Sequence, residues 1–192
     1  MLGTEQFDHF EITNGHFRPK GEDLTLEAMP IGCTGSVELE TETRTVQKKC
    51  EGKVSKEVTV IEKLTGTFTG HLTIDMAKEV FGLTGDGLKE GIVGYGRTSF
   101  GGSGSATWDV YDIGRENRKL IAIPNMSWTG GLKRVFTNGE DEIAEVEIEF
   151  SGLIDENGYF YYEMIVDETS DKETVDAWNK QFTTDLVQAP IA

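Results

Sequence analysis

Residues Glu145-Val146-Glu147-Ile148-Glu149-Phe150 alternate acidic and apolar side chains along the chain. Successive side chains of a β-strand point to opposite faces of its sheet, so this stretch predicts a strand with one apolar face and one face of repeated negative charge. Residues 37–42 repeat the pattern, with their acidic positions at Glu38, Glu40 and Glu42. Neighbouring like charges on one sheet face repel each other. Such faces suggest a surface that repels polyanions.

The whole chain is acidic, with 34 acidic and 18 basic residues and a net charge of −16 over 192 residues. This balance argues against a general nucleic-acid binder and against docking on an anionic membrane, because both need basic patches. The charge is also uneven. Residues 140–176 hold 14 acidic residues and one basic residue, whereas residues 44–63 hold six basic and three acidic residues. A basic segment in an acidic chain can contact an acidic surface of another copy, although most charge clusters are solvated surface.

Many short alternating segments, separated by turn residues, predict a mainly β protein: an antiparallel β-sandwich or barrel. One short packed helix is expected after Asp75, with Gly82 ending it, and Val175, Trp178 and Phe182 indicate a possible short C-terminal helix. A hairpin turn of type I′ is expected at Asn157-Gly158. The expected strands are 36–46, 58–61, 65–74, 107–113, 119–128, 142–153 and 159–166.

Length and composition predict a single domain over residues 1–192. Within it we expect an extended N-terminal arm over 1–34, a protruding basic loop over 47–57 and a C-terminal arm over 167–192. The chain has neither an apolar run that would span a membrane nor a visible signal peptide. Cys33 and Cys50 lack metal-ligand spacing and indicate two buried or free thiols in a reducing cytoplasm.

Motifs for catalysis or cofactor binding are not found, so we expect no enzyme activity, cofactor or metal. The three histidines (His9, His16 and His71) fit no metal or catalytic pattern. An acid pair for glycoside hydrolysis stays possible, because 34 carboxyl groups offer many pairs. A sugar-binding platform also stays possible, although core packing is the favoured role of its candidates. These are Trp108, Trp128 and Trp178.

The order of these features resembles the major tail tube proteins of long, non-contractile-tailed bacteriophages. The resemblance covers roughly residues 33–190 and rests on patterns of β-rich sequence. In chain order, the matching features are a strand, a basic hairpin tip, a Thr-rich strand, a short helix ending Val80-Phe81-Gly82-Leu83, a glycine-rich loop, two strands with Pro124, and the run from Ala144 to Phe150. The ending also fits, with Asp176-Ala177-Trp178, Phe182 and Val187 before Pro190.

The resemblance implies a structural protein of the virion tail, assembled in the host cytoplasm. Copies would form rings, usually hexameric, that stack into a hollow tube around a tape-measure protein and join other tail components. DNA would pass through the lumen without specific binding. The candidate lumen residues are Glu38, Glu40, Glu42, Glu145, Glu147 and Glu149, and the candidate ring-stacking residues are Lys48, Lys49, Lys53 and Lys56.

Two other functions remain open at this point. One is a carbohydrate-binding or adhesin-like β-sandwich module of a virion, which exposed aromatic side chains in one groove would favour. The other is a β-fold hydrolase with an acid pair, which a deep pocket holding two carboxylates would favour.

Overall fold

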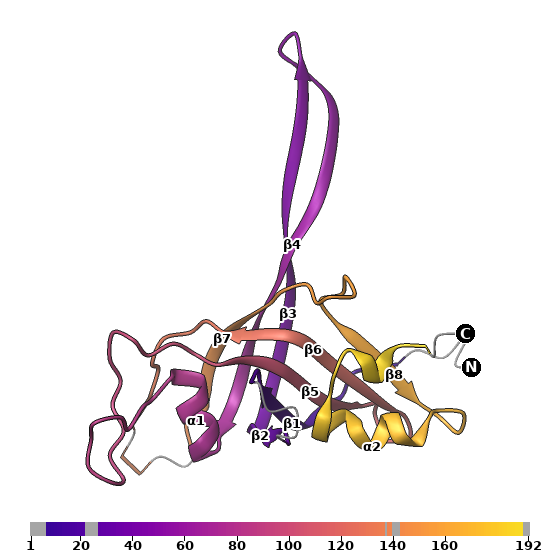
Figure 1. Cartoon of the computed structure of the whole chain (residues 1–192). Helices are drawn as coiled ribbons and strands as arrows, with labels where there is room; N and C mark the ends of the chain where they lie inside the picture. Colours follow the sequence, from indigo (N-terminus) through magenta and orange to yellow (C-terminus); the bar gives the residue numbers. More distant parts are fainter. Residues whose placement is uncertain (1–6, 22–26, 137, 140–142, 190–192) are drawn as a thin grey trace.

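The computed structural model describes residues 7–21, 27–136, 138–139 and 143–189. The predicted mainly β, antiparallel fold is confirmed, and both expected helices are present (Figure 1). The elements are β1 (Glu11–Pro19), β2 (Met29–Pro30), β3 (Gly32–Cys50), β4 (Lys53–Leu72), α1 (Ile74–Phe81), β5 (Ser103–Tyr111), β6 (Arg118–Trp128), β7 (Val146–Gly152), β8 (Tyr162–Val166), α2 (Lys172–Gln181) and the 3-10 turn η1 (Asp185–Val187).

All eight strands belong to one hydrogen-bonded sheet in the order β2-β1-β5-β6-β7-β4-β3, with β8 paired to β6. Just before β3, Ile31 donates its N–H to the carbonyl of Gly15 in β1 (2.8 Å), so the two sides of the sheet approach there. Among the described residues, however, no ladder joins β1 to β3 and closes the sheet. Of the two predicted forms, the barrel is therefore wrong.

Strand β6 changes its neighbour along its length. Residues 118–122 pair with β8, and residues 126–128 pair with β7. Pro124 lies in the gap between these ladders, next to a register shift against β5. Proline has no N–H to give to a ladder, so it is tolerated at such an irregularity and not within continuous pairing.

The core lies on the inner face of the bent sheet and is centred on Trp128. The Trp128 ring meets Phe17, Phe68 and Phe150 at centroid distances of 5.7, 6.2 and 5.9 Å. Ile148 and Phe150 are buried while Glu147 and Glu149, which alternate with them, are exposed, which confirms the predicted alternation in β7.

Helix α1 covers one end of this core with Met76, Val80 and Phe81. Its predicted end is confirmed: Gly82 has φ 60° and donates its N–H back to the last turn. The predicted start was misplaced by two residues. Thr73, not Asp75, is the N-cap, and its hydroxyl accepts a hydrogen bond from the Met76 N–H (3.2 Å).

The expectation of an N-terminal arm over 1–34 is wrong for its middle part. Strand β1 lies inside the sheet between β2 and β5, and its Phe17 is fully buried. A bulge between Thr13 and His16, with Asn14 at φ 54°, interrupts the alternation that would have revealed the strand. Residues 1–6 and 22–26 of this predicted arm lie outside the described residues.

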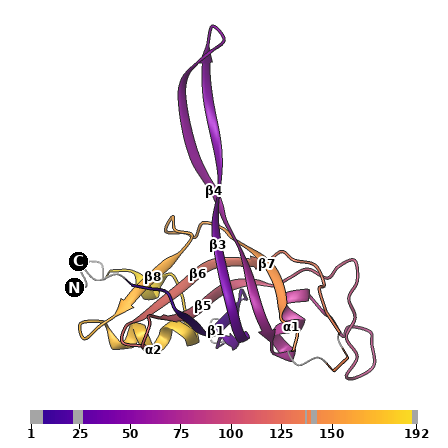
Figure 2. The same ribbon diagram turned by 180° about the vertical axis from the view of Figure 1, so that it is seen from behind.

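The C-terminal arm predicted over 167–192 is also wrong, because α2 is packed against the sheet (Figure 2). Trp178 and Phe182 form a second core cluster with Leu120 and Ala122 of β6, and the Trp178 indole N–H donates to the carbonyl of Ile121 (3.1 Å). The predicted C-terminal helical stripe is confirmed. Residues 190–192 lie outside the described residues.

The predicted hairpin at Asn157-Gly158 is not formed. Strands β7 and β8 both pair with β6 and not with each other, and of the two turn residues only Gly158 has a positive φ (90°). The Asp155 carboxylate orders this turn by accepting the N–H groups of Asn157 and Tyr159.

Replacing Trp178 with Ala should lower the free energy of unfolding by about 3–5 kcal/mol, because it leaves a cavity between α2 and β6. Chemical denaturation measures the loss. The control is Asp176→Ala, an exposed position on the same helix, expected to change stability by about 0.5 kcal/mol or less. A Trp178→Ala loss as small as that of the control would show that α2 contributes little to the fold.

Candidate functional site: the projecting hairpin and the acidic face

Strands β3 and β4 form a hairpin that rises far beyond the body of the protein (Figures 1 and 2). Their ladder runs from the pair Gly32–Leu72 to the pair Cys50–Lys53. Glu51 and Gly52 close it with φ values of 51° and 79°, which is the geometry that two-residue hairpin turns favour. The segment predicted to protrude over 47–57 does so, and its backbone is paired strand up to the turn, so it is the tip of a hairpin and not an unpaired loop.

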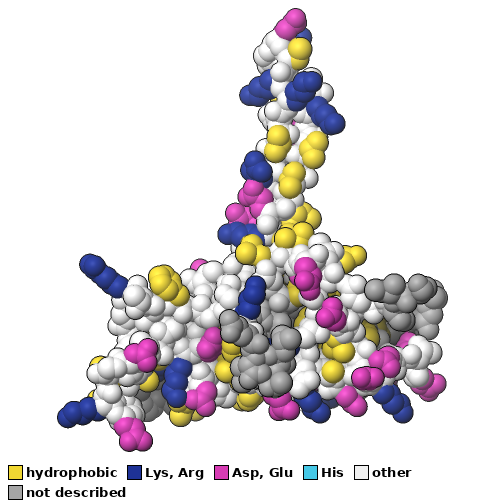
Figure 3. Space-filling view, in the orientation of Figure 1, with side chains coloured by type: hydrophobic (Ala, Val, Ile, Leu, Met, Phe, Trp, Pro, Cys, Tyr) yellow, Lys and Arg dark blue, Asp and Glu magenta, His cyan; other side chains and the backbone are white. Residues whose placement is uncertain are grey.

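Every residue from 41 to 62 is exposed, so neither face of this part of the hairpin rests on the body. The exposed side chains are not only polar. Pairing places Val46 opposite Val58 and Arg44 opposite Val60, on one face of the ribbon. Figure 3 shows apolar side chains midway along the hairpin and basic side chains nearer its tip. The hairpin therefore presents an apolar middle section to solvent.

The four lysines predicted as stacking residues lie together near the tip. Lys48 pairs directly with Lys56, and Lys53 pairs with Cys50. Lys49 lies next to Lys48, at a register shift opposite Val54. Directly opposed like charges destabilise a two-stranded ladder. A negatively charged partner would relieve this repulsion.

The two acidic runs lie on the same face of the sheet, which their separation in sequence did not reveal. Glu38 of β3 pairs with Thr67 of β4, and Thr67 pairs with Glu149 of β7. One step along, Thr69 of β4 lies beside Glu147. The threonines of β4 thus separate two rows of carboxylates. All six predicted lumen residues are exposed.

Basic side chains reach only part of this acidic face. Lys133 lies 2.9 Å from the Glu147 carboxylate, and Lys63 lies 3.0 Å from that of Glu42. Exposed pairs of this kind contribute little stability. Glu38, Glu40 and Glu149 line a groove together with Lys63 and Thr67. Within the described part of the chain, no three His, Cys, Asp or Glu side chains are grouped so that they could hold a metal ion.

The acidic face and the basic tip are parts of one continuous hairpin face. Even-numbered residues of β3 keep the same side, so the row of Glu38, Glu40 and Glu42 continues as Arg44, Val46 and Lys48. The hairpin is therefore acidic at its base and basic at its tip, with exposed valines and Arg44 between the two. This order can join copies head to tail, because the tip of one complements the base of the next.

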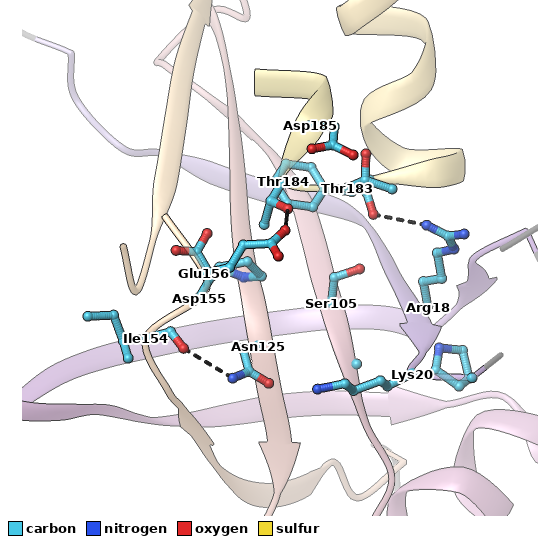
Figure 4. A pocket seen from close by; sticks show the side chains of 15 residues that line it. Arg18, Lys20, Ser105, Asn125, Ile154, Asp155, Glu156, Thr183, Thr184 and Asp185 are labelled. Carbon is cyan, nitrogen blue, oxygen red and sulfur yellow. Dashed lines mark hydrogen bonds between the residues drawn. The ribbon is translucent and has the colours of Figure 1, made fainter. Parts of the chain in front are cut away.

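A separate pocket of about 480 Å³ lies between the end of β1, the middle of β6 and the C-terminal segment (Figure 4). Three carboxylates line it, those of Asp155, Glu156 and Asp185, and the first two have hydrogen-bond partners. Asp155 accepts the Tyr162 hydroxyl (2.6 Å) as well as the turn N–H groups, and Glu156 accepts the Thr184 hydroxyl (2.7 Å). Burial, followed by the hydrogen bond to Asp155, raises the pKa of Tyr162 to about 12. These bonds give both acids a role in ordering the local chain.

The suggested tryptophan platform is not formed. Trp108, Trp128 and Trp178 are 0, 3 and 1% exposed, so core packing, the favoured role, is confirmed for all three. Sequence patterns missed a buried polar group, Asp109 of β5. Its carboxylate accepts hydrogen bonds from Asn14, Arg118 and Asn179, and it thereby ties β1, β6 and α2 together.

Comparison with models of known protein families gave no match, and comparison with curated proteins gave none either. None of the described helices has the length and apolar character needed to cross a membrane.

Replacing residues 44–60 with Asn-Gly, between the paired residues Thr43 and Ile61, should leave the fold intact. The removed segment contributes no buried side chain, and Asn-Gly favours the required turn. We expect the midpoint of thermal unfolding to stay within about 2–4 °C of the parent, corresponding to a change of about 1 kcal/mol at most. Circular dichroism measures it. A much larger loss would mean that the hairpin stabilises the body.

Proposed function

We propose that this chain is a structural protein that assembles into stacked rings, forming the hollow tail tube of a long-tailed bacteriophage. The sequence resemblance supports this function, including hexameric rings, a tape-measure protein inside the growing tube and passage of DNA through the lumen. In this proposal the chain carries out no catalysis and needs no cofactor.

The observation that carries the proposal is the projecting hairpin. A two-stranded ribbon is at best marginally stable alone in water, and this one exposes Val46, Val58, Val60 and Ile61 along its length. Contact with a second protein surface would bury apolar side chains that the single chain leaves in water. The sequence of charges along the hairpin favours another copy of the same chain as that surface.

The acidic face supports the proposed lumen. Affinity for DNA depends mainly on neutralising phosphates, so a wall lined with carboxylates lets DNA slide. A six-fold ring would multiply the rows of Glu38, Glu40, Glu147 and Glu149 around the channel.

Reversing the charge of the hairpin tip tests the stacking contact. The variant Lys48→Glu, Lys49→Glu, Lys53→Glu and Lys56→Glu should fold normally but fail to form tubes, because its tip would repel the acidic base of the next copy. The matched control replaces the same four lysines with Arg, which keeps the charge. Negative-stain microscopy and light scattering of concentrated protein, with and without other tail components, give the result. Normal tubes from the Glu variant would remove the hairpin tip from the stacking contact.

Reversing the acidic face tests the lumen. With Glu145, Glu147 and Glu149 changed to Lys, tubes should still assemble but should retain DNA, and this retention should weaken steeply as salt rises. The control changes the same residues to Gln, which removes charge without adding a phosphate-binding group. DNA ejection from particles carrying each variant is the measurement. Ejection from the Lys variant at the normal rate would place this face outside the channel.

A further inference from the structure

One end of the protein exposes an unusual amount of apolar surface. This loop end consists of residues 83–100, which follow α1, and residues 130–136, which follow β6 (Figure 1). The two segments lie against each other, because the Tyr95 hydroxyl accepts the Leu132 N–H (3.4 Å). Phe100 and Phe136 are 77% and 86% exposed. Six more exposed apolar side chains accompany them: Leu88, Ile92, Val93, Tyr95, Leu132 and Val135.

The charge of the loop end is opposite to that of the whole chain. It holds four basic residues and two acidic ones, for a net charge of +2, whereas the chain carries −16. Apolar side chains rimmed by charges are the usual composition of a protein-binding surface. Because the rim is basic, its partner should be acidic.

The far end of the same molecule has the complementary character. This helix end consists of residues 112–117, between β5 and β6, and residues 167–173, which lead into α2; it lies at the other side of the body from α1 (Figures 1 and 2). It holds six acidic and two basic residues, for a net charge of −4. Ile113 is 65% exposed there, and the neighbouring Phe10, whose N–H bonds to Tyr111, is 68% exposed.

We propose that the loop end of one copy binds the helix end of the next, and that this is the contact within a ring. The inference rests on the proposed function and extends it by naming the lateral interface. Binding between two different surfaces of one chain is heterologous, and repetition closes a ring when the rotation allows it. The hairpin points away from the line that joins the two ends, so stacking and lateral contacts use separate surfaces (Figure 1).

Charge exchange tests this interface. The loop-end variant carries Lys89→Glu, Arg97→Glu and Arg134→Glu, and the helix-end variant carries Glu116→Lys, Glu168→Lys and Glu173→Lys. All six side chains are exposed. Asp167 and Asp171 are left unchanged, because their carboxylates hold the turn and the N-cap of α2.

Each single-end variant should need a protein concentration higher by on the order of tenfold or more to assemble, because like charges then face each other. The chain carrying all six changes should assemble as the parent does, since its two ends are again complementary. An equimolar mixture of the two single-end variants should also recover, with the variants alternating around the ring. Sedimentation velocity and electron microscopy measure assembly, and circular dichroism checks that each variant is folded.

The outcomes separate this inference from the proposed function. If the parent forms tubes and the folded single-end variants form them equally well, the lateral interface is refuted while the tube function stands. Failure of the folded six-change chain to recover would also refute it. The parent with the shortened hairpin should still form single rings, because it keeps both ends. If the parent assembles under no condition, even with other tail components, both proposals fall.

Discussion

The ladder that β4 makes with β3 on one side and β7 on the other is the constraint on which this architecture depends. Its register, Glu38 to Thr67 to Glu149, sends one set of side chains to the core and the opposite set to solvent. A shift by one residue would move Phe68, Ile148 and Phe150 out of the core and bring the carboxylates in. Burial of the aromatic cluster around Trp128 therefore fixes the acidic face as firmly as it fixes the core.

The same ladder also produces the hairpin. The first part of β3, up to residue 40, and the last part of β4, from residue 63, lie on the core. Residues 41–62 continue the ladder beyond the core. The bulge at Glu42–Thr43 marks this boundary, since β4 has an extra residue there, Glu62, whose carboxylate forms an ion pair with the Arg44 side chain. Bulges increase the local twist of a ladder. The bend and added twist at the bulge turn the ribbon away from the sheet of the body.

Local alternation was enough to predict the mainly β fold and the exposed glutamates of β7, and capping residues were enough to predict the helix that ends at Gly82. It could not predict β1, where the bulge at Asn14 breaks the pattern, or the extent of the hairpin, whose tip carries lysines in place of the apolar side chains that mark a half-buried strand. It also could not place the two acidic runs on one face, because Glu38 and Glu149 meet only through the pairing of distant strands. The lysines of the tip could be identified in the sequence. That the valines below them are exposed could not be predicted, because it depends on the hairpin extending beyond the core.

A net charge of −16 opposes assembly of identical chains, and the distribution of charge offers a way around this repulsion. At physiological ionic strength the field of an exposed charge falls off over about 8 Å, so distant acidic surfaces repel weakly and contacting groups dominate. Basic side chains gather at the two places where a neighbouring copy is proposed to touch, the hairpin tip and the loop end. An acidic chain with local basic contacts resists random aggregation and favours only arrangements that bring tip to base and loop end to helix end.

The long free edge of β3 also needs protection from aggregation, because an uncovered edge strand can pair with any other strand. A neighbouring copy that covers the hairpin in one defined position would protect this edge and would form the stacking contact of the proposed tube.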